Sequence, residues 1–107
     1  MKTSPESISC AAKLAVLADP TRLAVVEVLL RGPKRVTEIN RSIRTTQSLL
    51  FHHLRILRDA GIVISCREGK SLKYALAPGV EGGVSRKGIN LGCCNLTFGN
   101  VTFGKRK

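Results

Sequence analysis

The sequence predicts an α+β fold that is mainly helical, with a short β-hairpin and an extended glycine-rich C-terminal tail. Up to residue 60, apolar residues recur at helical spacing in four segments, each of which follows a capping residue. After Gly61 the pattern changes to two runs of strand character around a tight turn. Prolines and glycines at 78–83 then mark a break, so we expect one domain over residues 1–80 and a basic tail over residues 81–107.

Each expected helix has its own start signal, because serine, threonine and aspartate side chains bond the unpaired N–H groups of a first helical turn. The expected caps are, in chain order, Ser4, Asp19, Thr37 and Thr46. Proline follows the first two caps directly, which suits the first helical position. The four helices should extend to Leu17, the Gly32-Pro33 pair, Ile43 and Ala60.

Two segments have the composition of hairpins. Residues 62–67 and 71–76 predict two strands joined by a turn at Glu68-Gly69-Lys70. Residues 89–103 also look extended, and Leu96-Thr-Phe-Gly-Asn100 is followed by the similar Val101-Thr-Phe-Gly-Lys105. Two copies are too few for a solenoid, so we expect a small terminal hairpin or a strand pair exchanged with a partner chain.

The charge balance indicates a polyanionic partner. The chain has 107 residues, with 18 Lys+Arg against 7 Asp+Glu and a net charge of +11. The excess is shared between residues 1–80, with 13 basic and 6 acidic residues, and the tail, with 5 and 1. Nucleic acid is the commonest partner of such a domain. The chain shows no apolar run of the ~20 residues that a membrane span needs and no apolar signal segment at residues 1–6, so we expect a cytoplasmic protein.

Two short helices, a tight turn and a hairpin together predict a winged helix-turn-helix. In its fourth helix, Leu50, Leu54 and Leu57 share one face and should pack inward. The opposite, outward face carries Gln47, Ser48, Phe51, His52 and Arg55. In such a fold the side chains at the start of this helix meet base edges in the major groove of DNA.

The residue types on this face suit base contacts. Gln47 can pair with adenine through two hydrogen bonds, and Ser48 can bond either kind of base edge. Phe51 either presses on a thymine methyl group or, after a small rotation of the helix, packs into the core. For His52 we favour DNA contact over metal binding, and we expect His53 to be hydrogen-bonded and half-buried. Thr46, at the start of the helix, belongs to the same predicted DNA-binding set.

Basic residues around this helix and on the hairpin should contact DNA phosphates, which supply affinity without sequence information. The strongest candidates are Arg44 in the turn and Arg67 and Lys70 on the wing. Taken singly, each is better explained as a solvated surface charge than as a DNA contact. Their combination with the polar face of the fourth helix favours DNA binding.

Three segments together resemble a known family. They are Leu17-Ala-Asp-Pro-Thr-Arg-Leu23, Leu29-Leu-Arg-Gly32 and Phe51-His-His-Leu-Arg-Ile-Leu-Arg-Asp-Ala-Gly-Ile-Val63. In their combined spacing they are similar to the ArsR/SmtB family of bacterial repressors, over roughly residues 10–77. The resemblance implies a homodimeric winged-helix repressor that leaves operator DNA when it binds a metal ion, a metalloid or another thiol-directed signal.

Carried over residue by residue, the resemblance implies DNA contacts for Gln47, Ser48 and His52. The chain departs from the family at Val36-Thr-Glu-Ile-Asn40, which lacks the Cys-x-Cys of the arsenic and cadmium sensors. Its tail also lacks the Asp/His/Glu set of the zinc and cobalt sensors, and an extended tail stands where the family has a long dimerisation helix. Neither inducer site can therefore be transferred.

The four cysteines leave one candidate sensing site. With no export signal we expect no structural disulfide, and Cys10 and Cys66 are read first as small buried apolar residues. Cys93 and Cys94 are adjacent and follow a glycine that could form a turn. Two thiolates, with a third from Cys10, Cys66 or a partner subunit, would suit a metalloid or a thiophilic metal ion. Oxidation at the pair, or a tail that only mediates dimerisation, are the alternatives.

No catalytic triad, phosphate-binding loop or dinucleotide motif is present in the sequence, so we do not expect an enzyme. The sequence predicts a homodimeric, sequence-specific DNA-binding repressor that is released by a thiol-directed signal at Cys93 and Cys94. The alternatives are a winged-helix module for protein interaction and a regulator without an inducer site.

Overall fold

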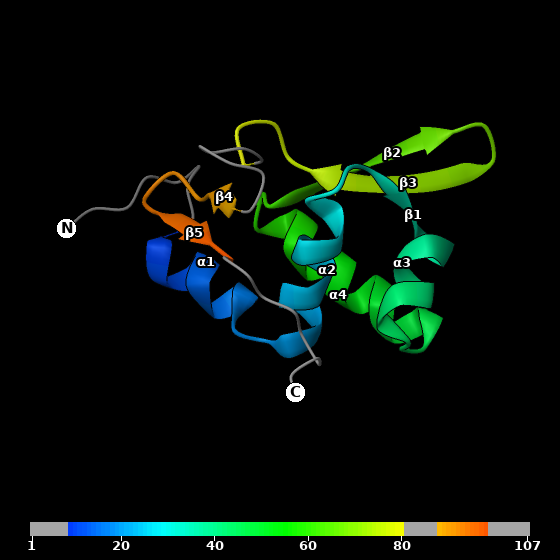
Figure 1. Ribbon diagram of the computed structural model, residues 1–107, viewed down its shortest axis with the longest axis horizontal. Coiled ribbons are helices and arrows are strands. Elements are labelled where there is room, and N and C mark those ends of the chain that lie inside the picture. The colour runs from blue at the N-terminus through cyan, green and yellow to red at the C-terminus, as the bar shows by residue number, and fades with distance from the viewer. Residues whose placement is uncertain (1–8, 81–87, 99–107) are drawn as a thin grey trace.

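The computed structural model describes residues 9–80 and 88–98, and its fold is a winged helix-turn-helix with an additional small hairpin (Figure 1). The predicted helix start at Ser4 and the second copy of the five-residue repeat lie outside the described residues. The four helices are α1 (Cys10–Leu17), α2 (Pro20–Leu29), α3 (Val36–Ile43) and α4 (Gln47–Asp59).

Two of the four predicted helix starts differ from the structure. The helix that contains Ala11 was predicted to start at Ser4, but α1 begins at Cys10, where Ser9 Oγ accepts the N–H of Ala12 at 3.2 Å. Asp19 Oδ1 accepts the backbone N–H groups of Thr21 and Arg22 at the start of α2. These bonds lower the pKa of the Asp19 carboxyl below its ordinary 3.8, since they favour its charged form. At α3 the predicted cap was wrong: the helix begins at Val36, before Thr37, because Glu38 Oε1 accepts the N–H of Arg35 at 2.8 Å.

The two predicted strands of the wing are confirmed, and a third strand joins them. Strands β2 (Val63–Glu68) and β3 (Ser71–Leu76) pair antiparallel from Val63↔Leu76 to Glu68↔Ser71. The two-residue strand β1 (Lys34–Arg35) pairs with the other edge of β3, so the sheet has the order β1-β3-β2. The prediction of a two-stranded sheet was therefore incomplete, and the end of α2 is connected to the wing through β1.

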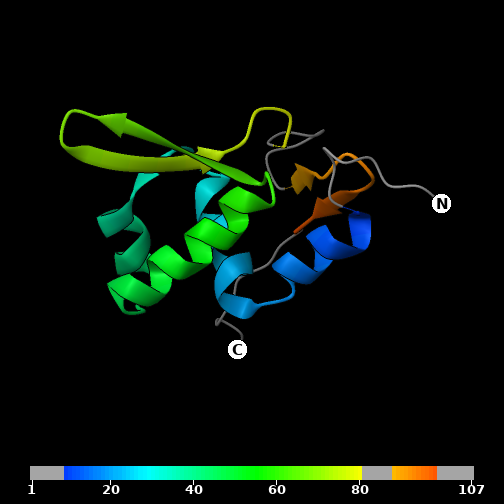
Figure 2. The same ribbon diagram turned by 180° about the vertical axis from the view of Figure 1, so that it is seen from behind.

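The described part of the tail forms a hairpin within the chain. Strand β4 (Gly88–Asn90) pairs with β5 (Asn95–Thr97), and the hairpin lies beside α1 in both views (Figures 1 and 2). Glycine is required at 88, because a Cβ there would lie 2.6 Å from the backbone oxygen of Leu96. Ile89 and Leu91 are buried and join the apolar core.

The core lies between α2, α3, α4 and the sheet. Its members include Val25 and Val26 of α2, Ile39 of α3, and Leu54 of α4, each fully buried. Burial of a side chain of this size is worth about 1.5–3 kcal/mol, so these contacts fix α4 against the rest of the molecule. Among the described helices, none is long and apolar enough to cross a membrane.

Candidate nucleic-acid interface and sulfur cluster

Helix α4 separates its side chains into a buried face and an exposed face, as the sequence predicts. Leu50, Leu54 and Leu57 are fully buried. The outward residues are exposed, and they are Gln47, Ser48, Phe51, His52 and Arg55. Phe51 is 38% exposed, so the alternative in which it packs into the core does not describe this structure. Leu49, which was not among the predicted contacts, is 46% exposed beside Gln47 and Ser48 and adds apolar surface there.

The turn before α4 fixes where its polar end points. Arg44 ends α3 with a left-handed backbone (φ 64°), and its N–H bonds to Asn40 O at 2.7 Å. The N–H of Thr45 bonds to Asn40 Oδ1 at 3.3 Å. Thr46 Oγ1 then accepts the N–H of Leu49 at 3.1 Å, so the Thr46 hydroxyl is the N-cap of α4. Asn40 and Thr46 therefore hold the first turn of α4 in place.

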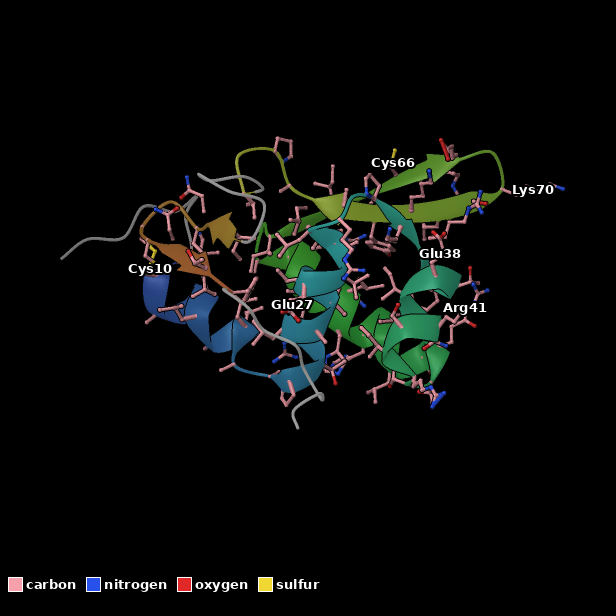
Figure 3. The ribbon with its side chains drawn as sticks, in the orientation of Figure 1. Cys10, Glu27, Glu38, Arg41, Cys66 and Lys70 are labelled. Atoms are coloured by element: carbon pink, nitrogen blue, oxygen red, sulfur yellow. A yellow bond between two sulfur atoms is a disulfide. The ribbon has the colours of Figure 1, made fainter. Side chains whose placement is uncertain are left out.

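The predicted phosphate-contacting residues lie on two separate elements. Arg44, Arg67 and Lys70 are all exposed, and Lys70 extends from the tip of the hairpin (Figure 3). Lys73 forms an ion pair with Glu68 at 3.1 Å between partly exposed groups, which reduces its free charge. Lys34 and Arg35 were missed at the sequence level, although a basic pair after Gly32-Pro33 could have indicated them. Through β1 they add positive charge to the sheet opposite Lys73.

His53 is buried and hydrogen-bonded, as predicted, and its partner is Arg22 of α2. Arg22 Nη1 lies 3.1 Å from His53 Nδ1. Burial lowers the pKa of His53 below its ordinary 6.5, because it disfavours the charged imidazolium, and Asp19 opposes this shift. A neutral His53 can accept the Arg22 N–H at Nδ1. Its neighbour His52 lies on the exposed face, so the two histidines have separate roles.

Three cysteine sulfurs form a cluster where α1 meets the β4–β5 hairpin. Cys10 and Cys93 form a disulfide, and the Sγ of Cys94 lies 3.7 Å from that of Cys10 and 3.9 Å from that of Cys93. The three sulfur atoms lie within 4.8 Å of one another. The turn expected at Gly92 is present: Gly92 has φ 92°, and the N–H of Leu91 bonds to Cys94 O at 2.8 Å. This turn brings both adjacent cysteines to the first residue of α1.

Three expectations about the cysteines were wrong. Cys10, which we expected to be a small buried apolar residue, is half-buried and bonded to Cys93. The expectation of no disulfide fails at Cys10–Cys93, because the fold brings together two residues that are 83 positions apart in the sequence. Cys66, which we expected to be buried, is exposed on β2 because its side chain lies on the solvent face of the strand. Figure 3 shows Cys10 at the start of α1 and Cys66 on the wing, so Cys10 is the third sulfur beside Cys93 and Cys94.

The cluster has two chemical states that exclude each other. With the disulfide closed, two of the three sulfurs are bonded to one another and only Cys94 is a thiol. When the disulfide is reduced, three thiols from two elements converge. Three convergent thiolates are a donor set for soft, thiophilic ions, whose bonds to sulfur bring ligand sulfurs to about 3.8 Å from each other at ~2.3 Å bond lengths. The distances to Cys94 are close to that spacing.

Comparison with known proteins identifies the winged-helix segment. Residues 19–65 match the family model described as "Bacterial regulatory protein, arsR family". The transcriptional regulator NmtR of Mycobacterium tuberculosis is 38% identical over 73 residues, which cover 68% of this chain and 61% of NmtR. The chain thus spans less than two thirds of this relative, and about half of other curated relatives.

Two solved structures share the fold. The transcriptional repressor BigR from Xylella fastidiosa is 36% identical with a TM-score of 0.59, covering 63% of this chain and 66% of BigR. The homodimeric winged helix-turn-helix DNA-binding domain of Mb0332 from Mycobacterium bovis is 27% identical with a TM-score of 0.60, covering 63% and 62%.

The relatives are regulators of transcription, in agreement with the prediction that the chain is not an enzyme. The matched segment contains the Asp19 cap, helices α2, α3 and α4, and the first three residues of β2. The fold and these matches agree with the family resemblance that the sequence shows. Residues 19–65 of the chain are a helix-turn-helix domain of the ArsR family of bacterial regulatory proteins.

Proposed function

We propose that this protein is a homodimeric, cytoplasmic repressor that binds an operator through α4 and leaves it on a thiol-directed signal. The observation that carries the DNA-binding part is the exposed face of α4. Its first residues, Gln47 and Ser48, offer amide and hydroxyl groups, while the leucines behind them are fully buried. A helix fixed in this way can enter the major groove without rearrangement of the core.

Each residue of this face has a role that its chemistry suits. Gln47 reads adenine through two hydrogen bonds, and Ser48 bonds a neighbouring base edge. Phe51 supplies an apolar contact to a thymine methyl group. His52 and Arg55, further along α4, contact base or phosphate, and Thr46 sets the direction of the helix through its cap.

The wing and the turn supply affinity. Arg44 precedes α4, and Arg67 and Lys70 lie on the hairpin, so the three cations flank the proposed reading face along the chain and bind the phosphates on either side of it. Such contacts make binding depend steeply on salt, because each neutralised phosphate releases a bound counterion.

A second copy of the chain is expected on the surface of α1. The exposed residues of this helix and its C-cap recur at helical spacing and are all apolar, namely Ala11, Leu14, Ala15 and Ala18. Leu14 is 40% exposed and is the largest of these exposed apolar side chains. An operator read by two α4 helices is two-fold symmetric, and the Mb0332 domain, which shares this fold, is homodimeric.

The DNA-binding part is tested by selection of binding sites from random duplexes. We expect Gln47→Ala to fold normally and to lose its preference at one base pair of each half-site, with a cost of about 1–3 kcal/mol for the preferred base. Thr97→Ala, which removes an exposed hydroxyl on β5, is the matched control and should retain the wild-type preference. An unchanged preference in Gln47→Ala would remove this residue from the reading set.

The rival function is a winged-helix module that binds another protein. Salt separates the two, because a hydrophobic protein interface would lose little affinity as ionic strength rises, whereas phosphate contacts weaken strongly. The net charge of +11 favours the DNA function.

The sulfur cluster is the proposed receiver of the signal. Oxidation joins Cys10 to Cys93, and a thiophilic ion or metalloid would instead be held by the thiolates of Cys10, Cys93 and Cys94. Either event changes the bonds that connect α1 to the β4–β5 hairpin. Because α1 is also the proposed dimer surface, such a change alters the spacing of the two reading helices and weakens operator binding.

The signal is tested with a panel of arsenite, cadmium, zinc, hydrogen peroxide and polysulfide in a DNA-release titration. Changing both Cys93 and Cys94 to serine should preserve operator binding and abolish release. Cys66→Ser is the matched control, since Cys66 is an exposed cysteine outside the cluster, and it should respond like the wild type. A normal response of the double variant would place the sensor elsewhere, whereas a wild type that none of these agents releases from DNA would show a regulator without an inducer site.

A further inference from the structure

Arg22 joins two helices that have different proposed tasks. It is the third residue of α2, and its side chain is half-buried between α1 and α4. Its Nε donates a hydrogen bond to the backbone oxygen of Val16, near the end of α1, at 2.6 Å. Its Nη1 lies 3.1 Å from His53 Nδ1 on α4. One side chain therefore contacts α1 and α4 at the same time.

The start of α1 is attached to the sulfur cluster. Cys10, its first residue, is bonded to Cys93, and Lys13 Nζ donates to Leu91 O at 2.9 Å. A helix of eight residues is about 12 Å long, so α1 is a short rod. The hairpin holds its first turn and Arg22 holds its last turn. A movement of the sulfur cluster is therefore transmitted through α1 to the Val16 carbonyl.

The contact between Arg22 and His53 is suited to hold α4 in one orientation. The guanidinium is planar, and its donors have fixed directions, so a shift of the Val16 carbonyl changes the direction in which Nη1 points. His53 is buried and adjacent in sequence to His52, which lies on the exposed face of α4. A rotation of α4 that follows His53 would displace that face.

We propose that Arg22 is the positioning residue that couples the state of the sulfur cluster to the orientation of α4. The inference rests on the proposed function, because it takes the cluster as the receiver and α4 as the DNA-reading helix. It adds the physical link between them: Cys10, α1, the Val16 carbonyl, Arg22, His53 and α4 form one series of contacts. Coupling along this series equals the difference in the free energy of operator binding between the reduced and the oxidised protein.

The test compares operator affinity with the cluster reduced and oxidised. Hydrogen peroxide closes the Cys10–Cys93 bond as two thiols lose two electrons and two protons, with two molecules of water formed per peroxide. We expect wild-type affinity to differ by about tenfold between the two states, within the usual range of allosteric coupling. In Arg22→Met the ratio should fall to near one, while the reduced variant still binds the operator.

The matched control is Arg31→Met, which removes an exposed arginine just after α2 and should keep the wild-type ratio. Arg22→Lys tests the geometry, since one ammonium group can reach the Val16 carbonyl or His53 but does not present two fixed donors, and its ratio should be reduced. His53→Leu should lower the ratio of reduced to oxidised operator affinity as Arg22→Met does. The double variant Arg22→Met/His53→Leu should show the same ratio as either single variant.

A second measurement does not depend on whether the variants fold. Imidazole ¹⁵N spectra of the wild-type protein should show a change at His53 on oxidation. An unchanged His53 spectrum, or a wild-type ratio in folded Arg22→Met, overturns the role of Arg22 alone. Equal operator affinity of the reduced and oxidised wild-type protein overturns the sensing function, and with it the proposed coupling through Arg22.

Discussion

Reduction of the Cys10–Cys93 bond should lower the stability of the protein by an amount that follows from the size of the loop that it closes. The two residues are 83 positions apart. The loop-closure relation gives an entropy of about 15 cal/mol/K for such a loop, which is about 4.5 kcal/mol at 25 °C. Measured disulfides commonly reach 2–4 kcal/mol, so the value is an upper bound. At about 4–8 °C per kcal/mol for a domain of this size, a loss of about 2–4 kcal/mol should lower the melting temperature by roughly 8–30 °C.

The assay is thermal unfolding followed by circular dichroism, with and without a reductant, on samples whose pairing has been confirmed by mass spectrometry of alkylated peptides. Cys10→Ser is the control, and its melting temperature should not respond to the reductant. If the wild type contains the Cys10–Cys93 bond and its melting temperature changes by less than about 3 °C on reduction, the bond does not restrict the unfolded chain as reasoned here. The Cys10–Cys93 bond would then contribute little to holding α1 on the β4–β5 hairpin.

Three further predictions concern salt, the α2 cap and pH. Contacts to about 4–8 phosphates per dimer should raise the operator dissociation constant about 10²- to 10⁴-fold between 50 and 200 mM salt, measured by fluorescence anisotropy, and a flat dependence would contradict phosphate binding. Asp19→Ala should lower the free energy of unfolding by about 1 kcal/mol in urea titrations, and Asp19→Asn should restore most of it, because the amide oxygen still accepts the N–H groups of Thr21 and Arg22. The lowered pKa of His53 means that its contribution to stability is complete above pH 6.5 and declines as pH falls below that value toward the folded-state pKa, where the unfolded chain binds the extra proton. This decline should be smaller in His53→Gln, and an identical pH profile for that variant would show that His53 does not cause it.

Much of the helical part could be predicted because its signals are local. Asp19 before Pro20 and Thr46 before Gln47 are caps whose effect depends on the next three residues, and both form the expected bonds. The start of α3 was misplaced because Glu38 accepts a bond from Arg35 behind it, while the sequence suggested Thr37 and Glu38 as the cap. Strand β1 was not predicted, since its two residues are strand-like only through pairing with the distant β3.

The candidate site also has one part that local sequence signals predict and one part that they do not. The exposed face of α4 follows from helical periodicity, and all five of its predicted residues are exposed, whereas exposed Leu49 was not predicted. The sulfur cluster was predicted only at Cys93 and Cys94, because the choice between Cys10 and Cys66 as third sulfur depends on where the hairpin packs. That packing is decided by burial of Ile89 and Leu91 in the core, which no local pattern reveals.

The contact of Arg22 with His53 shows the same limit. A buried, hydrogen-bonded histidine could be expected from its place on α4, but the partner lies 31 positions earlier in the sequence. Its identity depends on how α2 crosses α4, and that crossing follows from the packing of Val25, Val26 and Leu54 rather than from any residue near His53.

Methylation interference on the selected operator is the most direct test of the claim that α4 reads the major groove. Methylation of guanine N7 marks the major groove, and methylation of adenine N3 marks the minor groove. The account predicts that N7 methylation blocks binding in two half-sites whose centres are one helical turn, about 10 base pairs, or a multiple of it apart, and that Gln47→Ala weakens binding to the unmodified operator. Binding that tolerates N7 methylation throughout the site, with interference confined to adenine N3, would contradict it.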